Sequence, residues 1–578
     1  MSADNPNMVE RAKYLSRWNA LKQERSTWFA HWSDITKHLL PRNGRYFVSD
    51  RNRGQPRHNA IYDRTATGAL KTLSAGMMAG MTSPARPWLQ FATRDRALMK
   101  SQAVRLWCDE VTKLVLTVFA KGNTYRALHE VYKELGAFGT AGTVVLDDFS
   151  DVMRQYTLTA GEYCIAQDWR GETCTLYREF DKTVSEVVKE FGRENCSPNT
   201  VRMFDTGHLD AWVRIVHAIE PRADRDPSKR DAKNMAFSSI YFESGSDARY
   251  ILRESGYRDF PALAPRWDVA GGDVYGNGPG MEALGDVKQL QHQQLRKSQA
   301  IDYMTNPPLQ MPTGMKGREI SALPGGVTYF DTQQAPGARN LFQVQLDLNH
   351  MLADIQDVRG RINNAFYADL FLMLANSTNS QMTATEVAER HEEKMLMLGP
   401  VLERMNDELL NPLVQGAFHR ALAAGLVPPA PPEMQRQEIE VEYVSMLAQA
   451  QRAIGSNSID RFVGNLGAVA QFKPDVLDKF DADAWADAYS DMLGVDPNLI
   501  VGNDKVAIVR KQRQQAQVEA QQAAVNNQRA DTAQKLGNTP TQGGSSSALN
   551  DIMGGLTGYG SPSPSAVGIA AGDTARGA

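Results

Sequence analysis

The histidines, cysteines and paired carboxylates are the residues of this chain whose types could support catalysis or metal binding. His391 precedes Glu392 and Glu393, but the second histidine of a zinc-binding H-E-x-x-H helix is missing four residues on. The four cysteines show no C-x-x-C spacing, so we expect buried free thiols in a reducing compartment rather than a zinc module. A G-x-S-x-G nucleophile elbow and a P-loop are also missing. We therefore expect no enzyme activity, no metal and no cofactor.

A glycine-rich stretch, residues 271–280, reads GGDVYGNGPG and is only superficially like a phosphate-binding loop. No strand pattern leads into it and no Gly-Lys-Ser/Thr follows it, as a Walker loop requires. Adjacent carboxylates such as Asp147 and Asp148 point to different sides of a helix or strand, which favours a solvated face over a site. We interpret the glycine-rich stretch as the turn before a helix.

The balance of charged and apolar residues is that of an ordinary globular protein. The 578 residues are 42% apolar and 22% charged, with a formal net charge of −4. The chain therefore lacks the global cationic excess of simple nucleic-acid binders. It has no run of about 18 apolar residues that could span a membrane, and its first residues lack a signal-peptide pattern. We expect a soluble protein made in the cytoplasm, with several structural regions.

Residues 1–270 alternate helical and strand patterns, which predicts an α+β region. Apolar residues at three- and four-residue steps predict helices over 8–40, 100–121 and 124–138. Short β-rich runs between residues 143 and 254 predict an antiparallel sheet. Thr183 and Glu186 form a capping-box pattern that should open a short helix, which Gly192 should close.

The segment 65–91 combines small and apolar residues. Gly68, Gly76 and Gly80 form a ridge on which another backbone could pack closely, so we take them as candidates for subunit packing. An alternative is a peripheral membrane or ejection protein that inserts residues 69–81 as an amphipathic segment. Because that segment is short and carries Lys71, we favour helix packing in a soluble protein.

Two long helical patterns dominate the middle of the chain. The first, 281–303, is polar on most faces, and the second, 347–373, carries an apolar stripe. Between them lies a turn-rich insert, 306–342, with a strand candidate at 327–330. The stripe supplies four further candidates for subunit packing: Ile355, Val358, Ile362 and Phe366.

A polar break, 375–382, ends the second helix. Its short side chains compete for backbone hydrogen bonds: Asn376, Ser377, Thr378, Asn379, Ser380 and Gln381. A helix over 383–427 should follow, bent at Pro400 and Pro412, because proline removes a donor and clashes with the preceding turn. After a proline-rich link at 428–432 we expect helices over 439–535, and disorder over 537–578 because the composition there is Gly, Ser, Ala, Thr and Pro.

Several blocks of this sequence resemble the portal proteins of tailed bacteriophages, and more narrowly the head-to-tail connectors of short-tailed, T7-like phages. The blocks are TATGALKTLSAGMMAGMTSPARPWLQF at 65–91, IVHAIEPR at 215–222, the stretch 254–291 and the Asn-Pro-Pro step at 306–308. The third block is the most specific, since ESGY, PRW and YGNGP follow one another within it. The resemblance covers about residues 10–530.

This resemblance implies an α+β, helix-rich portal fold and a dodecameric ring with a central DNA channel, at one capsid vertex of the virion. The implied regions are the wing (1–270), the first stem helix (271–305), the clip (306–342), the second stem helix (343–374), the tunnel loop (375–382), the kinked wing helix (383–427) and the helical crown (428–536). The implied partners are further copies of the chain, the major capsid protein, the terminase, a tail adaptor protein, internal ejection proteins and double-stranded DNA without sequence specificity.

A DNA conduit should not grip its cargo, because a strongly basic wall would hold phosphates through counterion release. The two stem segments interleave basic residues with Asp286, Asp354, Asp357 and Asp369, as a wall that permits sliding should. The candidate channel residues are Lys288, Arg296, Lys297, Arg359 and Arg361.

Overall fold

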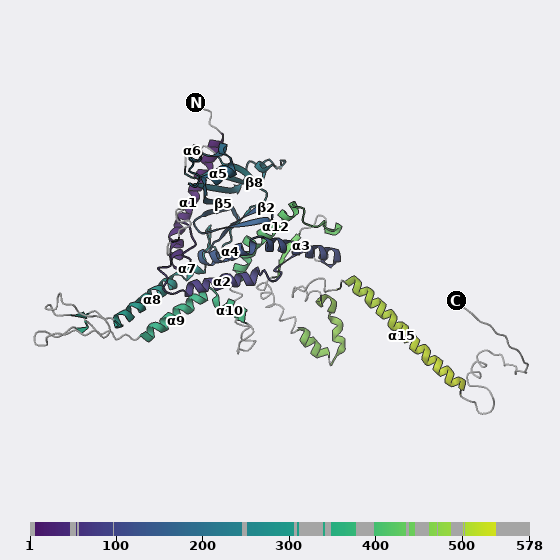
Figure 1. Ribbon diagram of the computed structural model, residues 1–578. Helices are drawn as coiled ribbons and strands as arrows, with labels where there is room; N and C mark the ends of the chain where they lie inside the picture. The colour runs from purple at the N-terminus through teal and green to yellow at the C-terminus, as the bar shows by residue number, and fades with distance from the viewer. Residues whose placement is uncertain are drawn as a thin grey trace, which may run out of the picture. The chain divides into compact units, whose positions relative to one another are not determined.

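A computed structural model of the chain describes residues 6–46, 54, 57–95, 98–229, 231–245, 251–305, 309–310, 339–340, 348–376, 398–434, 439–444, 462–470, 472–486, 501 and 503–538 (Figure 1). They divide into two compact units, one within residues 1–497 and one within 498–578. The second unit contains a long helix, α15 (Asn503–Asn538), whose described side chains are exposed from residue 507 onward.

A five-stranded antiparallel sheet forms the centre of the N-terminal region. Its strand order is β4-β5-β6-β7-β8, with bounds Tyr163–Gln167, Thr173–Thr183, Trp212–Pro221, Phe237–Glu243 and Arg253–Tyr257. One face is covered by α1 (Pro6–His38), which buries Tyr14, Trp18 and Leu21 against it. Opposite lie α5 (Val184–Phe191) and α6 (Pro198–Asp205). The predicted sheet, the predicted first helix and the Thr183–Glu186 capping box are confirmed.

A smaller sheet and five helices, α2, α3, α4, α9 and α10, contribute further to the core. β2 (Gly142–Asp148) pairs with β3 (Val152–Leu158) and β9 (Ala262–Leu263). Helices α3 (Gln102–Lys121) and α4 (Thr124–Phe138) match their sequence predictions. Helix α2 (Thr65–Met81) packs on α4, α9 (Leu348–Ala365) and α10 (Ala368–Asn376), and buries Leu70, Leu73 and Met77. The apolar side of residues 69–81 thus serves the protein core, which gives no support to the membrane-insertion alternative.

Two strands far apart in the sequence form a separate ladder. β1 (Leu89–Thr93) pairs antiparallel with β12 (Ile439–Tyr443), from Leu89 opposite Tyr443 to Thr93 opposite Ile439. The prediction that helix resumes at residue 439 is therefore wrong for 439–443. Ile439, Val441 and Tyr443 alternate with glutamates, and period-two alternation suits a half-buried strand. Trp88 stacks on both Phe119 and Tyr443 and ties this ladder to α3.

The glycine-rich stretch packs on the end of α4. Gly139 closes that helix in the left-handed region at φ 67°, and a Cβ there would collide with the carbonyl oxygen of Gly276. The Trp267 amide donates to the Gly139 carbonyl at 2.9 Å, and the Gly276 amide to Thr140 Oγ1 at 2.8 Å. Helices α7 (Pro279–Glu282) and α8 (Leu284–Thr305) follow, so the interpretation as a turn before a helix is confirmed.

The second long helical pattern is interrupted where the sequence predicts a continuous helix. Helix α9 ends at Ala365 and α10 begins at Ala368, and Tyr367 between them has φ 53°. A non-glycine residue in this region costs about 1 kcal/mol or more, which the surrounding packing has to offset. Phe366 and Phe371, on either side of the break, are both buried in the main core, and Tyr367 contacts Trp267. The turn at Tyr367 therefore accompanies burial of both phenylalanines in the core.

Pro412 lies at the start of α12 (Asn411–Ala423), directly after a π-helix at Asn406–Leu410. The Asn411 amide donates to the Asn406 carbonyl, five residues back, so the extra residue absorbs the irregularity that a proline imposes. The π-helix carries Glu408, which binds the buried Arg266. Arg266 reaches the two Glu408 oxygens at 3.2 and 2.7 Å, and also donates to Gly171 O at 2.6 Å. Pro400, the other expected bend, lies within helical residues 398–405.

A buried carboxylate joins α4 to the end of α1 and to the β3–β4 turn. Glu134 accepts hydrogen bonds from Asn43 Nδ2 at 2.5 Å, Thr159 Oγ1 at 2.7 Å and the Ala160 amide at 3.3 Å. Burial raises the pKa of Glu134 to about 7. The three hydrogen-bond donors act in the opposite direction and lower this pKa, but their effect is smaller. Glu134 therefore holds Asn43, after the end of α1, against α4 and the β3–β4 turn.

Candidate functional site

Helices α8 and α9 run side by side away from the sheet region, and their base is fixed by Asp63 (Figure 1). Asp63 is buried just before α2, and its Oδ2 accepts from Gln294 at 2.9 Å and from Arg359 at 3.2 and 2.8 Å. Its Oδ1 accepts from the Thr65 amide and hydroxyl at 2.8 and 2.6 Å. Gln291 of α8 holds the adjacent backbone, with Oε1 2.6 Å from the Tyr62 amide. One carboxylate thus joins three helices.

The pKa of Asp63 is lowered, although burial acts to raise it, because Thr65 and Arg359 donate to the ionised form. This contact uses Arg359, a candidate channel residue, inside the subunit. No local sequence pattern marked Asp63, since its partner is distant in sequence. The arrangement keeps the carboxylate ionised and fixes how the helix pair leaves the core.

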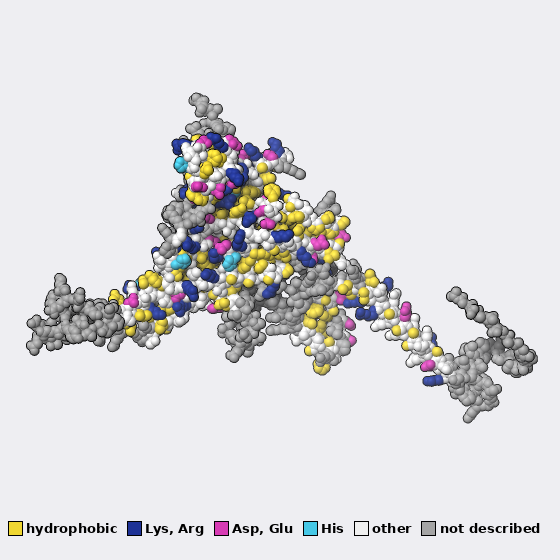
Figure 2. Space-filling model, in the orientation of Figure 1, with side chains coloured by type: hydrophobic (Ala, Val, Ile, Leu, Met, Phe, Trp, Pro, Cys, Tyr) yellow, Lys and Arg dark blue, Asp and Glu magenta, His cyan; other side chains and the backbone are white. Residues whose placement is uncertain are grey.

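Two further channel candidates are paired with carboxylates on the protein surface. Lys288 lies 2.6 Å from Asp34 Oδ2, and this contact lowers the pKa of Asp34. Arg361 lies 3.5 Å from both Asp286 and Asp357. Acidic and basic side chains are accordingly interspersed along this part of the molecule (Figure 2). These pairs reduce the net positive charge that the helix pair presents.

Arg296 and Lys297, the remaining channel candidates, differ from the other three. Arg296 contacts only neutral groups of its own helix, His292 Nε2 at 3.5 Å and Gln299 Oε1 at 3.3 Å. Among the described residues, neither cation has a carboxylate partner within ion-pair distance. The positive charge of α8 that lacks a carboxylate partner among the described residues therefore lies in the half of the helix farther from the sheet region.

The distal part of the helix pair exposes apolar side chains. Ile301, Tyr303 and Met304 near the end of α8 are 41%, 50% and 47% exposed, and Leu352 near the start of α9 is 40% exposed. Exposed apolar side chains that cluster at one end of an element mark interaction surfaces, whereas scattered single ones do not. This end of the pair has the surface that a second protein chain could cover.

The residues proposed for subunit packing have mostly found partners inside the chain. Ile355, Val358, Ile362 and Phe366 are buried in the main core. Gly80 is buried, and a Cβ at Gly76 would collide with the Phe371 ring, so the ridge on α2 admits α10 of the same chain. Gly68 faces open space. This placement explains the apolar stripe without a second subunit, whereas the apolar side chains at the distal helix ends are partly exposed.

The tunnel-loop and clip candidates lie largely outside the described residues. Asn376 is the last residue of α10, and Ser377, Thr378, Asn379, Ser380 and Gln381 fall beyond it, as does the strand expected at 327–330. At the two ends of the insert, β10 (Leu309–Gln310) pairs antiparallel with β11 (Arg339–Asn340). The insert thus returns the chain to the place where it left the helix pair.

Residues 11–501 match the family model described as bacteriophage head to tail connecting protein. The chain belongs to this family. It is 61% identical over 553 residues to a protein titled probable portal protein of Bordetella phage BPP-1, covering 95% of this chain and 99% of that protein. It is 43% identical over 535 residues to the portal protein of Salmonella phage epsilon15, covering 92% and 96% respectively.

Solved structures add little to this assignment. A solved chain from the neck of an empty gene transfer agent particle is 11% identical to this chain, with a TM-score of 0.33. The match covers 78% of this chain and 98% of the neck chain. A likeness at that level carries no argument. Membership of the head-to-tail connecting family therefore depends on sequence.

Within the described part of this connector chain, no group of three or more His, Cys, Asp or Glu side chains could hold a metal ion. No described helix is both long and apolar enough to cross a bilayer. Burial raises the pKa of Cys108 to about 11 and that of Cys164 to about 12, the latter against Arg25 and Lys22. Both thiols are therefore protonated near neutral pH and unreactive as nucleophiles.

Proposed function

We propose that this chain is a portal subunit, whose copies form a dodecameric ring at one capsid vertex. The ring is the conduit for genome packaging and ejection and the attachment point for the packaging motor and the tail. Family membership over residues 11–501 carries this proposal, together with two relatives whose titles name them portal proteins. The exposed apolar ends of α8 and α9 support it, because a ring of helix pairs would cover them.

Within this proposal, α8 and α9 are the stem and the segment 306–342 is the clip. The break at 375–382 is the tunnel loop, and residues 383–427 with the sheet region form the wing. Because β12 pairs with β1, we add residues 439–443 to the wing and begin the crown after them. The duplex passes without sequence-specific contacts, since most stem cations are paired with carboxylates and a weakly basic wall lets phosphates slide.

Negative-stain and cryo-electron microscopy of the purified full chain test the ring directly, and native mass spectrometry counts its subunits. We expect annular particles with a central opening. A sample that contains only monomers under conditions that preserve complexes would refute the ring. Footprinting on a defined duplex should show no protected sequence, and a protected site would contradict passage without sequence specificity.

The tunnel loop is tested by deletion of the polar break, residues 375–382, in the phage that encodes the chain. We expect rings to assemble but packaging or DNA retention to fail, because the loop would line the passage rather than join subunits. Packaged genomes of unchanged length and number would contradict this role.

A further inference from the structure

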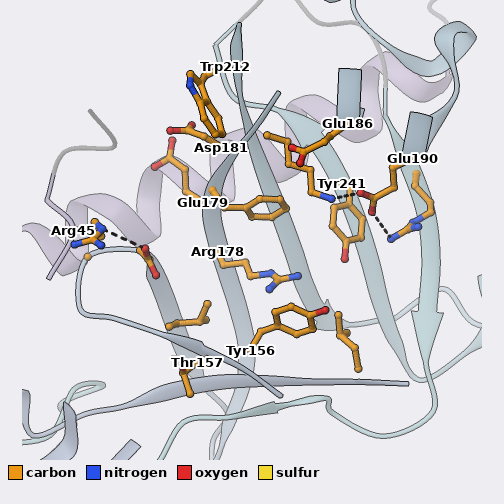
Figure 3. Close-up of a pocket in the computed structure, with 17 residues that line it drawn as sticks. Arg45, Tyr156, Thr157, Arg178, Glu179, Asp181, Glu186, Glu190, Trp212 and Tyr241 are labelled. Atoms are coloured by element: carbon orange, nitrogen blue, oxygen red, sulfur yellow. Dashed lines mark hydrogen bonds and ion pairs between the residues drawn. The ribbon is translucent and has the colours of Figure 1, made fainter. Parts of the chain in front are cut away.

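A cavity of about 640 Å³ lies between the five-stranded sheet and the β2–β3 hairpin, away from the helix pair. We call it the sheet groove. Its floor is formed by β5, β7 and β8, one wall by β3, and its rim by α5 and the turn at Gly161–Glu162 (Figure 3). None of the stem, clip or tunnel-loop assignments uses this groove.

Arg178 projects from β5 into the groove and is held by a neutral partner (Figure 3). Its Nε donates to His217 Nδ1 at 3.1 Å, and its guanidinium packs over Phe180 at 5.1 Å. His217 is fully buried, stacks on Tyr241 at 3.9 Å and donates through Nε2 to Ser239 Oγ at 2.9 Å. Burial, then Arg178 and Arg253, lower the pKa of His217 well below its usual value.

A neutral histidine therefore orients Arg178 without cancelling its charge. A guanidinium has five N–H donors, and the bond to His217 uses the one on Nε. Among the described residues, Arg178 forms no ion pair with a carboxylate. Its two Nη groups are thus preorganised donors that face the cavity, the geometry with which arginine binds carboxylates in pairs of hydrogen bonds.

Arg253 adds a second guanidinium to the floor. It packs over Tyr241 at 4.6 Å and over Phe191 at 5.3 Å. Among the described residues, its carboxylate contact is a long one, 3.9 Å to Glu190, whose other oxygen pairs with Lys182. The floor therefore carries more positive charge than its own carboxylates neutralise.

The rim has the opposite charge and selects against polyanions. Glu186 and Glu190 of α5 line it, together with Glu162, which lies 3.9 Å from Arg45. A nucleic acid or polyphosphate would bring many negative charges against these carboxylates. A ligand that carries one carboxylate between basic groups would instead place its carboxylate on a floor cation and its basic groups against the rim carboxylates. Tyr156, 46% exposed on the wall, offers an aromatic surface for an apolar neighbour of that carboxylate.

We propose that the sheet groove binds a peptide segment of another protein of the particle, through one Asp or Glu side chain seated on Arg178 and Arg253. An apolar residue beside that carboxylate packs on Tyr156, and flanking Lys or Arg residues face the acidic rim. This assignment is separate from ring formation, because the groove residues lie on the sheet and not on α8 or α9.

The test measures fluorescence polarisation of a labelled, capped peptide, Lys-Phe-Glu-Lys, with the purified full chain. We expect the peptide with Gln in place of Glu to bind at least about tenfold more weakly, because loss of a charged hydrogen-bond partner costs about that factor or more. Arg178→Gln should weaken the Glu peptide similarly. Arg154→Gln is the matched control, since Arg154 is an exposed β3 arginine outside the groove, and it should bind normally.

Circular dichroism and the melting temperature verify the fold of each variant, and electron microscopy verifies that it still forms the same assembly. If Arg178→Gln fails to fold, Tyr156→Ala on the exposed wall takes its place, with an expected loss of about threefold or more. Equal binding of the Glu and Gln peptides, or unchanged binding by Arg178→Gln, would overturn the proposal. Displacement of the peptide by duplex DNA would also overturn it, since it would identify a polyanion site.

Discussion

Ion pairs are used differently in the core of this protein and on its α8–α9 helix pair. In the core, the Arg266 side chain is 3% exposed and binds Glu408, Gly171 and Gln167, which lie on three separate parts of the chain. On the helix pair, Arg361 is 48% exposed and lies 3.5 Å from two surface aspartates. The comparison teaches that an arginine–carboxylate pair fixes the fold in one region and only adjusts surface charge in the other.

Removal of the core partner should have the largest effect. Glu408→Gln leaves the Arg266 charge buried without a counterion, and we expect a loss of about 3 kcal/mol in the free energy of unfolding. Arg361→Gln is the surface control and should cost at most about 1 kcal/mol. Chemical unfolding followed by tryptophan fluorescence measures both, and equal losses would break the comparison.

A second buried carboxyl group, Glu134, sharpens the comparison through pH. Its pKa is about 7 in the folded chain, against an ordinary value of 4.5, so between these pH values the folded chain keeps a proton that the unfolded chain has released. The free energy of unfolding should therefore fall as pH rises from 4.5 to 7, by up to about 1.4 kcal/mol per pH unit. Glu134→Gln should flatten this slope. An unchanged slope would show that Glu134 does not titrate in this range.

The third test separates backbone strain from crowding in the core. Gly139 and Gly171 both have positive φ, 67° and 81°, but only Gly139 faces a backbone carbonyl where a Cβ would be placed. Gly171→Ala should lower the free energy of unfolding by about 1 kcal/mol through backbone conformation alone. Gly139→Ala should lower it by about 2 kcal/mol or more, because the added Cβ also meets the Gly276 carbonyl oxygen. Melting temperatures of the two variants check this, and equal shifts would mean that the contact with Gly276 can relax.

The smallest expected effect concerns DNA and the helix pair. Arg296→Gln with Lys297→Gln should lower non-specific duplex affinity a few-fold and reduce the salt dependence of binding, because these cations lack carboxylate partners. Lys288→Gln with Arg361→Gln should change affinity less, since both cations are already paired. Filter binding at several salt concentrations measures the difference, and the reverse order would show that the paired cations face DNA.

The sequence predicted those elements whose signals are local. The Thr183–Glu186 cap needs residues only three positions apart, and the helices ending at Lys121 and Phe138 are each followed by a glycine, Gly122 and Gly139. The glycine-rich stretch 271–280 is also predictable as a turn, because no strand pattern precedes it and no Gly-Lys-Ser/Thr follows it. The blocks shared with phage connectors carry the family assignment, which needs no knowledge of contacts.

Contacts between distant residues were not predictable. Arg359 was selected as a channel residue because it is basic, but its partner Asp63 lies on another element with no motif around it. The break at Tyr367 follows from packing of Phe366 and Phe371, whereas the apolar spacing alone continues as one helix. The sheet groove could not be found from sequence either, because its residues come from β3, β5, β7 and β8.

The β1–β12 ladder has a consequence for synthesis of the protein. Leu89–Thr93 emerge from the ribosome long before Ile439–Tyr443, and at about 5–20 residues per second the delay is on the order of tens of seconds. During that time one edge of β1 has no strand partner, and Phe91 and Trp88 lack part of their final cover. Nascent chains at high concentration could pair through this edge, so expression at low temperature with chaperones should raise the yield of correctly folded protein.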